Sequence, residues 1–129
     1  MKLPSANTNP LDEAAREARV GASRIEFLDS LVGEEPVFGL LKTRTRTDTG
    51  NWFFKRPVWA CTLAGELLLF AKGKRPYAER VPFDKLGAST YNHVTGELML
   101  APADGLRVTR LKMPPMEGLQ VLAHVHRGE

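Results

Sequence analysis

The chain has 129 residues, 43% of them apolar and 26% charged, which is the composition of a globular domain and excludes a disordered or fibrous protein. Its single cysteine, Cys61, excludes an internal disulfide and a multi-thiolate metal site. No apolar run reaches the roughly 20 residues that span a bilayer, and the first ten residues lack the apolar segment of a secretory signal, so we predict a cytoplasmic protein.

The net charge of +3 is unevenly distributed along the chain. Residues 1–41 carry four basic and seven acidic side chains, whereas residues 42–129 carry 14 basic and eight acidic ones. The positive charge of the second part attracts the phosphates of lipid headgroups, nucleic acid or small anions. It does not choose among these ligands.

Two N-terminal segments precede the main domain. Residues 1–9 are predicted to be a flexible lead-in, and residues 10–33 a helical extension. Asn9 can cap the free amides, Pro10 suits the first helical position, and Gly33 is a plausible stop. Gly21 weakens the middle and can divide the segment into two helices. The apolar residues that recur at helical spacing, and so predict a face that packs on the domain, are Ala14, Ala18, Ile25, Leu28 and Val32.

From residue 35 to the end of the chain the pattern predicts a mainly β domain, 35–129. Strand-like segments separated by turn residues occupy 37–47, 52–63, 66–72, 78–86, 88–94, 97–101 and 106–113. A meander of seven antiparallel strands has to close or fold over to protect its edges, so we predict a small barrel. Residues 114–125 are predicted to form a helix that buries Met116, Leu119 and Leu122 or Ala123 over the open end of the barrel.

Short motifs in residues 35–126 point to a family. They are the run Gly39-Leu40-Leu41-Lys42, Trp52, the pair Lys55-Arg56, Trp59, the segment TLAGELLLF at 62–70, and ERVPF at 79–83 followed by the closing helix. Together they resemble a pleckstrin homology (PH) domain, closer to the bacterial PH-like type. The resemblance implies a seven-stranded barrel with a C-terminal capping helix and a headgroup pocket at the loops between the first strands.

The order of the turns places a group of cations at one end of this barrel. Successive turns of a meander alternate between ends, so the turns at 48–51 and 72–76 share one end and Ala64-Gly65 lies at the other. The residues expected there, called the basic rim below, are Arg46, Lys55, Arg56, Lys72, Lys74 and Arg75. Such side chains bind phosphate through charge and, for arginine, through a bidentate fork. Cations in hairpin loops also keep sheet edges soluble, so a merely solvated rim stays the alternative.

The segment KTRTRT, residues 42–47, alternates cations with threonines. The two-residue period of a strand puts Lys42, Arg44 and Arg46 on one face and the threonines on the other. Threonine suits a half-buried strand face, so we expect the cationic face to be solvated. Of the three cations, only Arg46 is close enough to the turn to join the basic rim.

The sequence supports an enzymatic function less well than anion binding. Cys61 could act as a nucleophile with His93, His124 or His126, but its apolar strand predicts a buried core thiol instead. His124 and His126 are two residues apart on a helix and face apart, which is poor geometry for a shared metal. Neither a P-loop nor a dinucleotide glycine pattern is present. We therefore predict no enzyme activity, no cofactor and no metal.

The predicted function is a non-enzymatic binding module whose basic rim contacts an anionic membrane surface or a phosphate-bearing ligand, with peripheral attachment to a membrane. The alternative is a protein-interaction or self-association scaffold without a small ligand, and a homo-oligomer stays open. Nucleic acid is less favoured. Trp52, Phe53 and Phe54 beside the Lys55-Arg56 pair have the composition of a single-strand binder, yet the same aromatics are expected in the packing of a small barrel.

Overall fold

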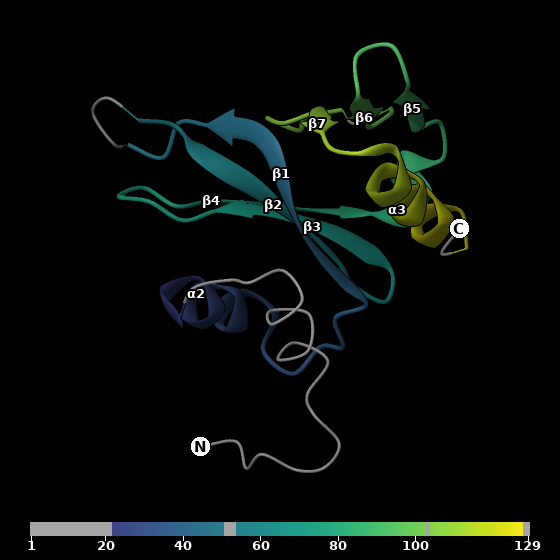
Figure 1. Ribbon diagram of the computed structural model, residues 1–129. Helices are drawn as coiled ribbons and strands as arrows, with labels where there is room; N and C mark the ends of the chain where they lie inside the picture. The colour runs from purple at the N-terminus through teal and green to yellow at the C-terminus, as the bar shows by residue number, and fades with distance from the viewer. Residues whose placement is uncertain (1–21, 51–53, 103, 128–129) are drawn as a thin grey trace.

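Seven strands in two antiparallel sheets form the centre of the computed structural model, which describes residues 22–50, 54–102 and 104–127 (Figure 1). The elements in chain order are α2 (Ala22–Val32), β1 (Gly39–Thr47), β2 (Arg56–Thr62), β3 (Glu66–Ala71), β4 (Tyr77–Pro82), the 3₁₀ helix η1 (Phe83–Leu86), β5 (Thr90–Asn92), β6 (Glu97–Met99), β7 (Arg110–Lys112) and α3 (Pro115–Arg127). Sheet A has the order β1-β2-β3-β4 and sheet B the order β5-β6-β7. The predicted lead-in, residues 1–9, and the first part of the predicted helical extension lie outside the described residues.

The two sheets are not closed into the predicted barrel. The register between β1 and β2 shifts between Lys42 and Arg46, an irregularity of the kind that bends a strand, and pairing resumes at Arg46 and Thr47. In the bent half, the Thr45 hydroxyl donates to Arg110 O at 3.2 Å and accepts the Lys112 N–H at 2.7 Å. These side-chain bonds join β1 to β7 where a closed barrel would have a ladder. Because β7 has only three residues, it offers little main chain for one.

Sheet A is buried on both faces, and this explains why its middle strands read as unbroken apolar runs. Its inner face, toward sheet B and α3, presents Val58 and Ala60 of β2 with Leu67 and Leu69 of β3. Its outer face, toward α2, presents the alternate residues of the same strands, which are Trp59, Cys61, Leu68 and Phe70. The molecule is therefore built in three layers, with α2 on one side of sheet A and sheet B with α3 on the other (Figure 1).

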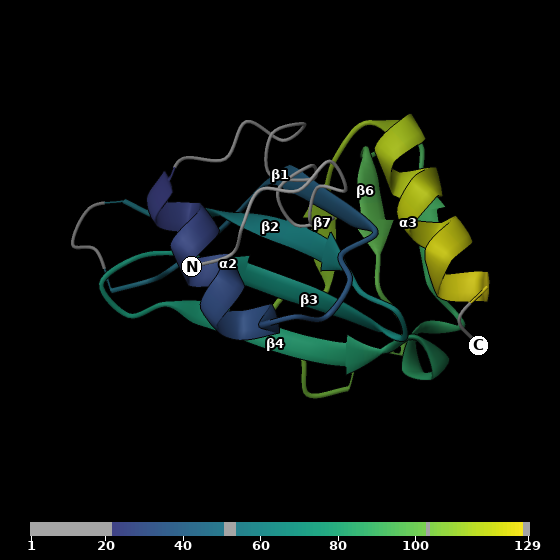
Figure 2. The same ribbon diagram turned by 90° about the horizontal axis from the view of Figure 1, so that it is seen from below.

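Helix α2 covers the outer face of sheet A, as Figure 2 shows from below. Leu28 and Val32 are buried against the sheet, as predicted, while the side chains of residues 22–26 lie outside the description. Gly33 follows the helix with a φ of 59°, a conformation that disfavours other residues, and so confirms the predicted stop.

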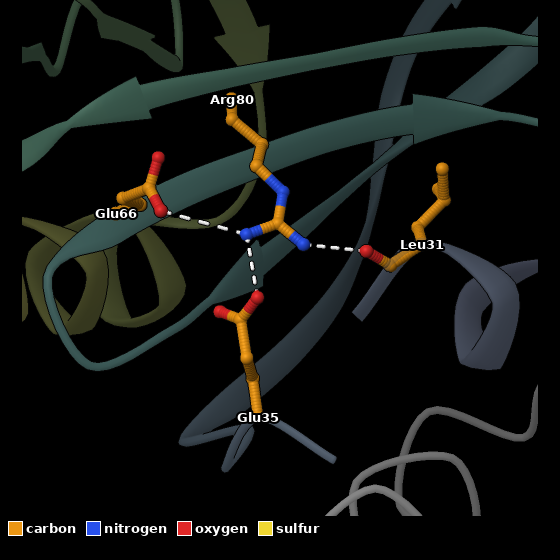
Figure 3. A network of polar contacts seen from close by, with 4 residues as sticks. All are labelled: Leu31, Glu35, Glu66 and Arg80. Atoms are coloured by element: carbon orange, nitrogen blue, oxygen red, sulfur yellow. Dashed lines mark hydrogen bonds and ion pairs between the residues drawn. The ribbon is translucent and has the colours of Figure 1, made fainter. Parts of the chain in front are cut away.

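Arg80 of β4 fixes the C-terminal end of α2 (Figure 3). Its guanidinium donates to Leu31 O of α2 at 2.5 Å and pairs with Glu35 at 2.8 Å and Glu66 at 3.5 Å. The hydrogen bond to Glu35 is the main reason that the pKa of Arg80 lies above its usual value. One side chain thus links the helix, the segment that follows it and two strands of sheet A.

The predicted strand at 78–86 is too long. β4 ends at Pro82, and the next four residues form η1 with Phe83 and Leu86 buried in the core. Phe83 N–H still donates to Gly65 O at 3.0 Å, in register with the β3–β4 ladder, and η1 begins at this residue.

The predicted buried face of the C-terminal helix is wrong for Met116 and Leu119, whereas Leu122 is half-buried and packs against the core. In α3 the buried residues are Gly118, Val121 and Val125, whereas Met116 is 80% and Leu119 50% exposed. The reason is the ring of Tyr91: a Cβ at position 118 would lie 2.4 Å from it. Only glycine lets the helix approach the ring so closely, so Gly118 decides which face turns inward. Neither described helix is long and apolar enough to cross a membrane.

Candidate functional site

The loops that carry the basic rim meet at one end of sheet A. The Arg75 N–H, between β3 and β4, donates to Thr49 O, between β1 and β2, at 2.5 Å. Beside this bond, the stem of Arg75 packs so closely on Gly50 that a Cβ there would lie 3.0 Å from it. Gly50 also has a φ of 82°, so glycine is required for both conformation and space. The prediction that these two turns share one end is confirmed.

The rim cations of β1 and β2 lie next to one another. Arg46 pairs in register with Pro57, and its guanidinium donates to Lys55 O at 3.4 Å. Arg56 is half-buried at the start of β2, and its shielded Nε has no acceptor within the described structure.

The other rim cations come from the loop between β3 and β4. Arg75 and Lys74 are exposed and Lys72 is half-buried. The structure thus brings all six predicted rim residues to the same end of sheet A, at the left of Figure 1. The cationic face of residues 42–47 is solvated as predicted, since Lys42, Arg44 and Arg46 are exposed and Thr43 and Thr47 are buried.

Arg107, from the chain between β6 and β7, also reaches this end, although it was not among the residues predicted for the basic rim. Its guanidinium donates to Asp48 O and lies 5.2 Å above the ring of Tyr77. The backbone N–H of Arg107 donates to the Glu79 carboxylate at 2.9 Å, and the Tyr77 hydroxyl donates to the same carboxylate at 2.5 Å. Burial and Glu79 together raise the pKa of Tyr77 well above its usual value, so this donor stays protonated. Arg107 therefore joins the rim from a third loop and is held from two sides.

An apolar side chain stands beside the cations. Phe54, which precedes Lys55, is 70% exposed, whereas most aromatic side chains of the described residues are packed. Trp52 and Phe53, considered with Phe54 as candidates for binding single-stranded nucleic acid, lie outside the described residues. Phe54 shows that this end of the molecule offers an apolar contact together with positive charge.

Comparisons with protein-family models, with curated proteins and with solved structures found no match.

The residues considered for catalysis do not form a reactive group. Cys61 is fully buried, and burial raises the pKa of its thiol to about 12, so it is the predicted core thiol. His124 packs against Phe38, with ring centroids 6.2 Å apart, while His126 is exposed and His93 lies beside Tyr91. Within residues 22–50, 54–102 and 104–127, no three potential metal-ligating side chains come together.

Proposed function

We propose that this chain is a non-enzymatic, PH-like binding module whose basic rim contacts an anionic membrane surface. The observation that carries the proposal is the exposed Phe54 beside Lys55, at a rim where Arg46, Arg56 and Arg75 converge. An aromatic side chain can enter the interfacial region of a bilayer while neighbouring cations bind the headgroup phosphates. Seven antiparallel strands followed by a C-terminal helix are what the PH resemblance implies, and they support the assignment.

Neighbouring charges favour an anionic partner. Two carboxylates belong to this end: Asp48 accepts the Gly50 N–H at 2.8 Å, and Glu79 accepts bonds from the Tyr77 hydroxyl and the Arg107 backbone N–H. The six residues of the basic rim and Arg107 outnumber these two carboxylates, so the field at this end is positive. Each cation near an anionic surface contributes about 1 kcal/mol of attraction, and salt weakens that attraction.

Vesicle co-sedimentation tests the proposal. The full chain should bind phosphatidylcholine vesicles that contain phosphatidylserine, not pure phosphatidylcholine vesicles, and binding should fall as salt rises. Reversing Arg46, Arg56 and Arg75 to Glu should remove at least about 3 kcal/mol, or about two orders of magnitude in affinity. Phe54→Ala should weaken binding without changing its salt dependence.

Lys85→Glu is the matched control, because this exposed lysine lies on η1, which follows the end of β4 remote from the rim. It should bind as the wild type does. A competition arm separates the two sources of phosphate: inorganic phosphate that displaces the protein from vesicles more effectively than sodium chloride of the same ionic strength assigns the rim to a free phosphate-bearing ligand, not a membrane. Absence of binding to acidic vesicles even at low salt would overturn the proposal.

A further inference from the structure

The first half of β1 is an open sheet edge that faces α3. β1 is the outer strand of sheet A and pairs with β2 from Gly39 to Lys42. Its bonds to β7 begin only at Thr45, beyond the shift in register. Among the described strands, none pairs with the other edge of this half. Main-chain groups on such an edge can receive an added strand.

Two hollows lie between this edge and α3. The smaller, of about 140 Å³, is lined by main chain and side chains of 38–41 together with Thr62, Gln120, Val121 and His124. The larger, of about 270 Å³, is lined by Phe38, Leu63, Ala64, Phe83, His124 and Arg127. Phe38 and His124 belong to both, so the hollows follow one another along one groove that runs from β1 to the end of α3. We call it the β1–α3 groove.

The size of the hollows fits side chains of an extended segment. Alternate side chains of a strand lie about 7 Å apart and project to the same side, so an extended segment can place side chains of one face in two adjacent hollows. Phe38, which stands between the hollows, is 57% exposed although it is a large apolar side chain. Leu63 and Phe83 give the larger hollow apolar walls, while Gln120 and Thr62 offer polar groups in the smaller one.

Among the described residues that line the larger hollow, Arg127 carries a positive charge. Arg127 is exposed, and its Nε donates to Ala123 O at 3.2 Å, which orients the guanidinium beside the hollow. Burial and the nearby Arg127 lower the pKa of His124, so His124 is neutral at pH 7 and the charge is that of Arg127. Glu117, the acidic residue of α3, lies in its first turn, about 15 Å along the axis from Arg127.

We propose that the β1–α3 groove binds an extended acidic peptide segment of a partner protein as an added strand along Gly39–Leu41. An apolar side chain of the peptide fills the larger hollow against Phe38 and Phe83, and a neighbouring carboxylate pairs with Arg127. The unpaired edge supplies the main-chain partners, the two adjacent hollows receive side chains from one face of the added strand, and Arg127 selects acidic over basic sequences. This site lies at the end of sheet A opposite the basic rim, so one molecule could hold a surface and a partner at once.

Selection from a phage-displayed library of random decapeptides on the immobilised full chain tests this proposal. Enriched sequences should share an apolar residue close to an acidic one. A synthetic enriched peptide should shift the amide resonances of Gly39, Leu41, Gln120 and His124 in a ¹⁵N NMR titration. The same peptide with Lys in place of its acidic residue should bind at least about tenfold more weakly.

Two variants of exposed residues separate the site from the fold. Phe38→Ala and Arg127→Glu should each weaken peptide binding by about tenfold or more, with unchanged circular dichroism. Met116→Ala, which removes an exposed apolar side chain of α3 that lines neither hollow, should bind as the wild type. No enrichment, or enriched peptides that bind Phe38→Ala and Arg127→Glu unchanged or shift resonances elsewhere, would overturn the proposal. Vesicle binding is scored separately, because neither variant touches the basic rim.

Discussion

Replacing Arg80 with alanine should release α2 from sheet A without unfolding the domain. The substitution removes the bond to Leu31 O and both ion pairs. Arg80 is 31% exposed and its glutamate partners 45% and 36%, so each pair contributes only about 0.2–1 kcal/mol. The partly solvated bond to Leu31 adds about 1 kcal/mol. The Glu66 pair joins two strands of sheet A and is not broken when α2 opens, so only the Glu35 pair and the Leu31 bond count toward the opening. The expected loss is therefore about 1–2 kcal/mol, which is about a 5- to 30-fold increase in the opening of α2.

Cys61 reports this opening. Its thiol is fully buried in the cluster that α2 covers, and its pKa of about 12 leaves almost no thiolate in the closed state. Reaction with an aromatic disulfide reagent in native buffer should therefore measure the open population. Arg80→Ala should accelerate the reaction by about 5- to 30-fold. The control Arg44→Ala, which removes an exposed arginine of β1, should leave the rate unchanged.

Urea dependence separates local opening from global unfolding. If α2 opens locally, the labelling rate should rise only weakly with urea, because little surface is exposed. An unchanged labelling rate in Arg80→Ala would refute the role given to this arginine. A rate that follows the full urea dependence of global unfolding would refute a separately opening α2.

Three further predictions concern contacts between elements of the fold and the titration of His124. Gly118→Ala should destabilise the domain by about 1–3 kcal/mol in urea titrations because its Cβ would collide with Tyr91, whereas Gly65→Ala, with open space around it, should be nearly neutral. Thr45→Val should cost about 1–3 kcal/mol and speed hydrogen exchange of the Lys112 amide; equal protection in both proteins would contradict the bridge between β1 and β7. Because the folded-state pKa of His124 is lowered, the unfolded chain binds the proton more readily, so stability should fall as pH drops below about 6.5. His124→Gln should flatten this part of the stability profile relative to His126→Gln; identical profiles would show that His124 is not responsible.

Local sequence signals predicted the elements better than their packing. All seven strand segments contain a strand, and α2 ends before Gly33 as expected, because periodicity and turn residues act over a few neighbours. The buried face of α3 could not be predicted from such local signals. Two of its large apolar residues, Met116 and Leu119, are exposed because the approach of Tyr91, 27 residues before Gly118, turns the glycine inward. A glycine in a helix beside larger apolar residues was the available signal, and it suggests close packing rather than flexibility.

The candidate site was partly predictable for the same reason. The alternation of turns is a property of any meander, so the convergence of Arg46 and Arg75 followed from element order alone. Arg107 could not be placed, because it lies in an irregular connection whose path depends on how sheet B crosses sheet A. The bend of β1 also depends on a shift in register that no local pattern in KTRTRT announces.

The burial of sheet A between two layers has a consequence for biosynthesis. Chains are made from the N-terminus, so α2 leaves the ribosome before β1 to β4, and it can cover the outer face as soon as β4 is complete. The inner face must wait for residues 97–125, which supply Leu98, Leu111, Val121 and Val125 to its core. Until those residues are synthesised, the nascent chain exposes the apolar inner face of sheet A. Chaperones therefore have the largest apolar surface to bind while the last quarter of this chain is being made.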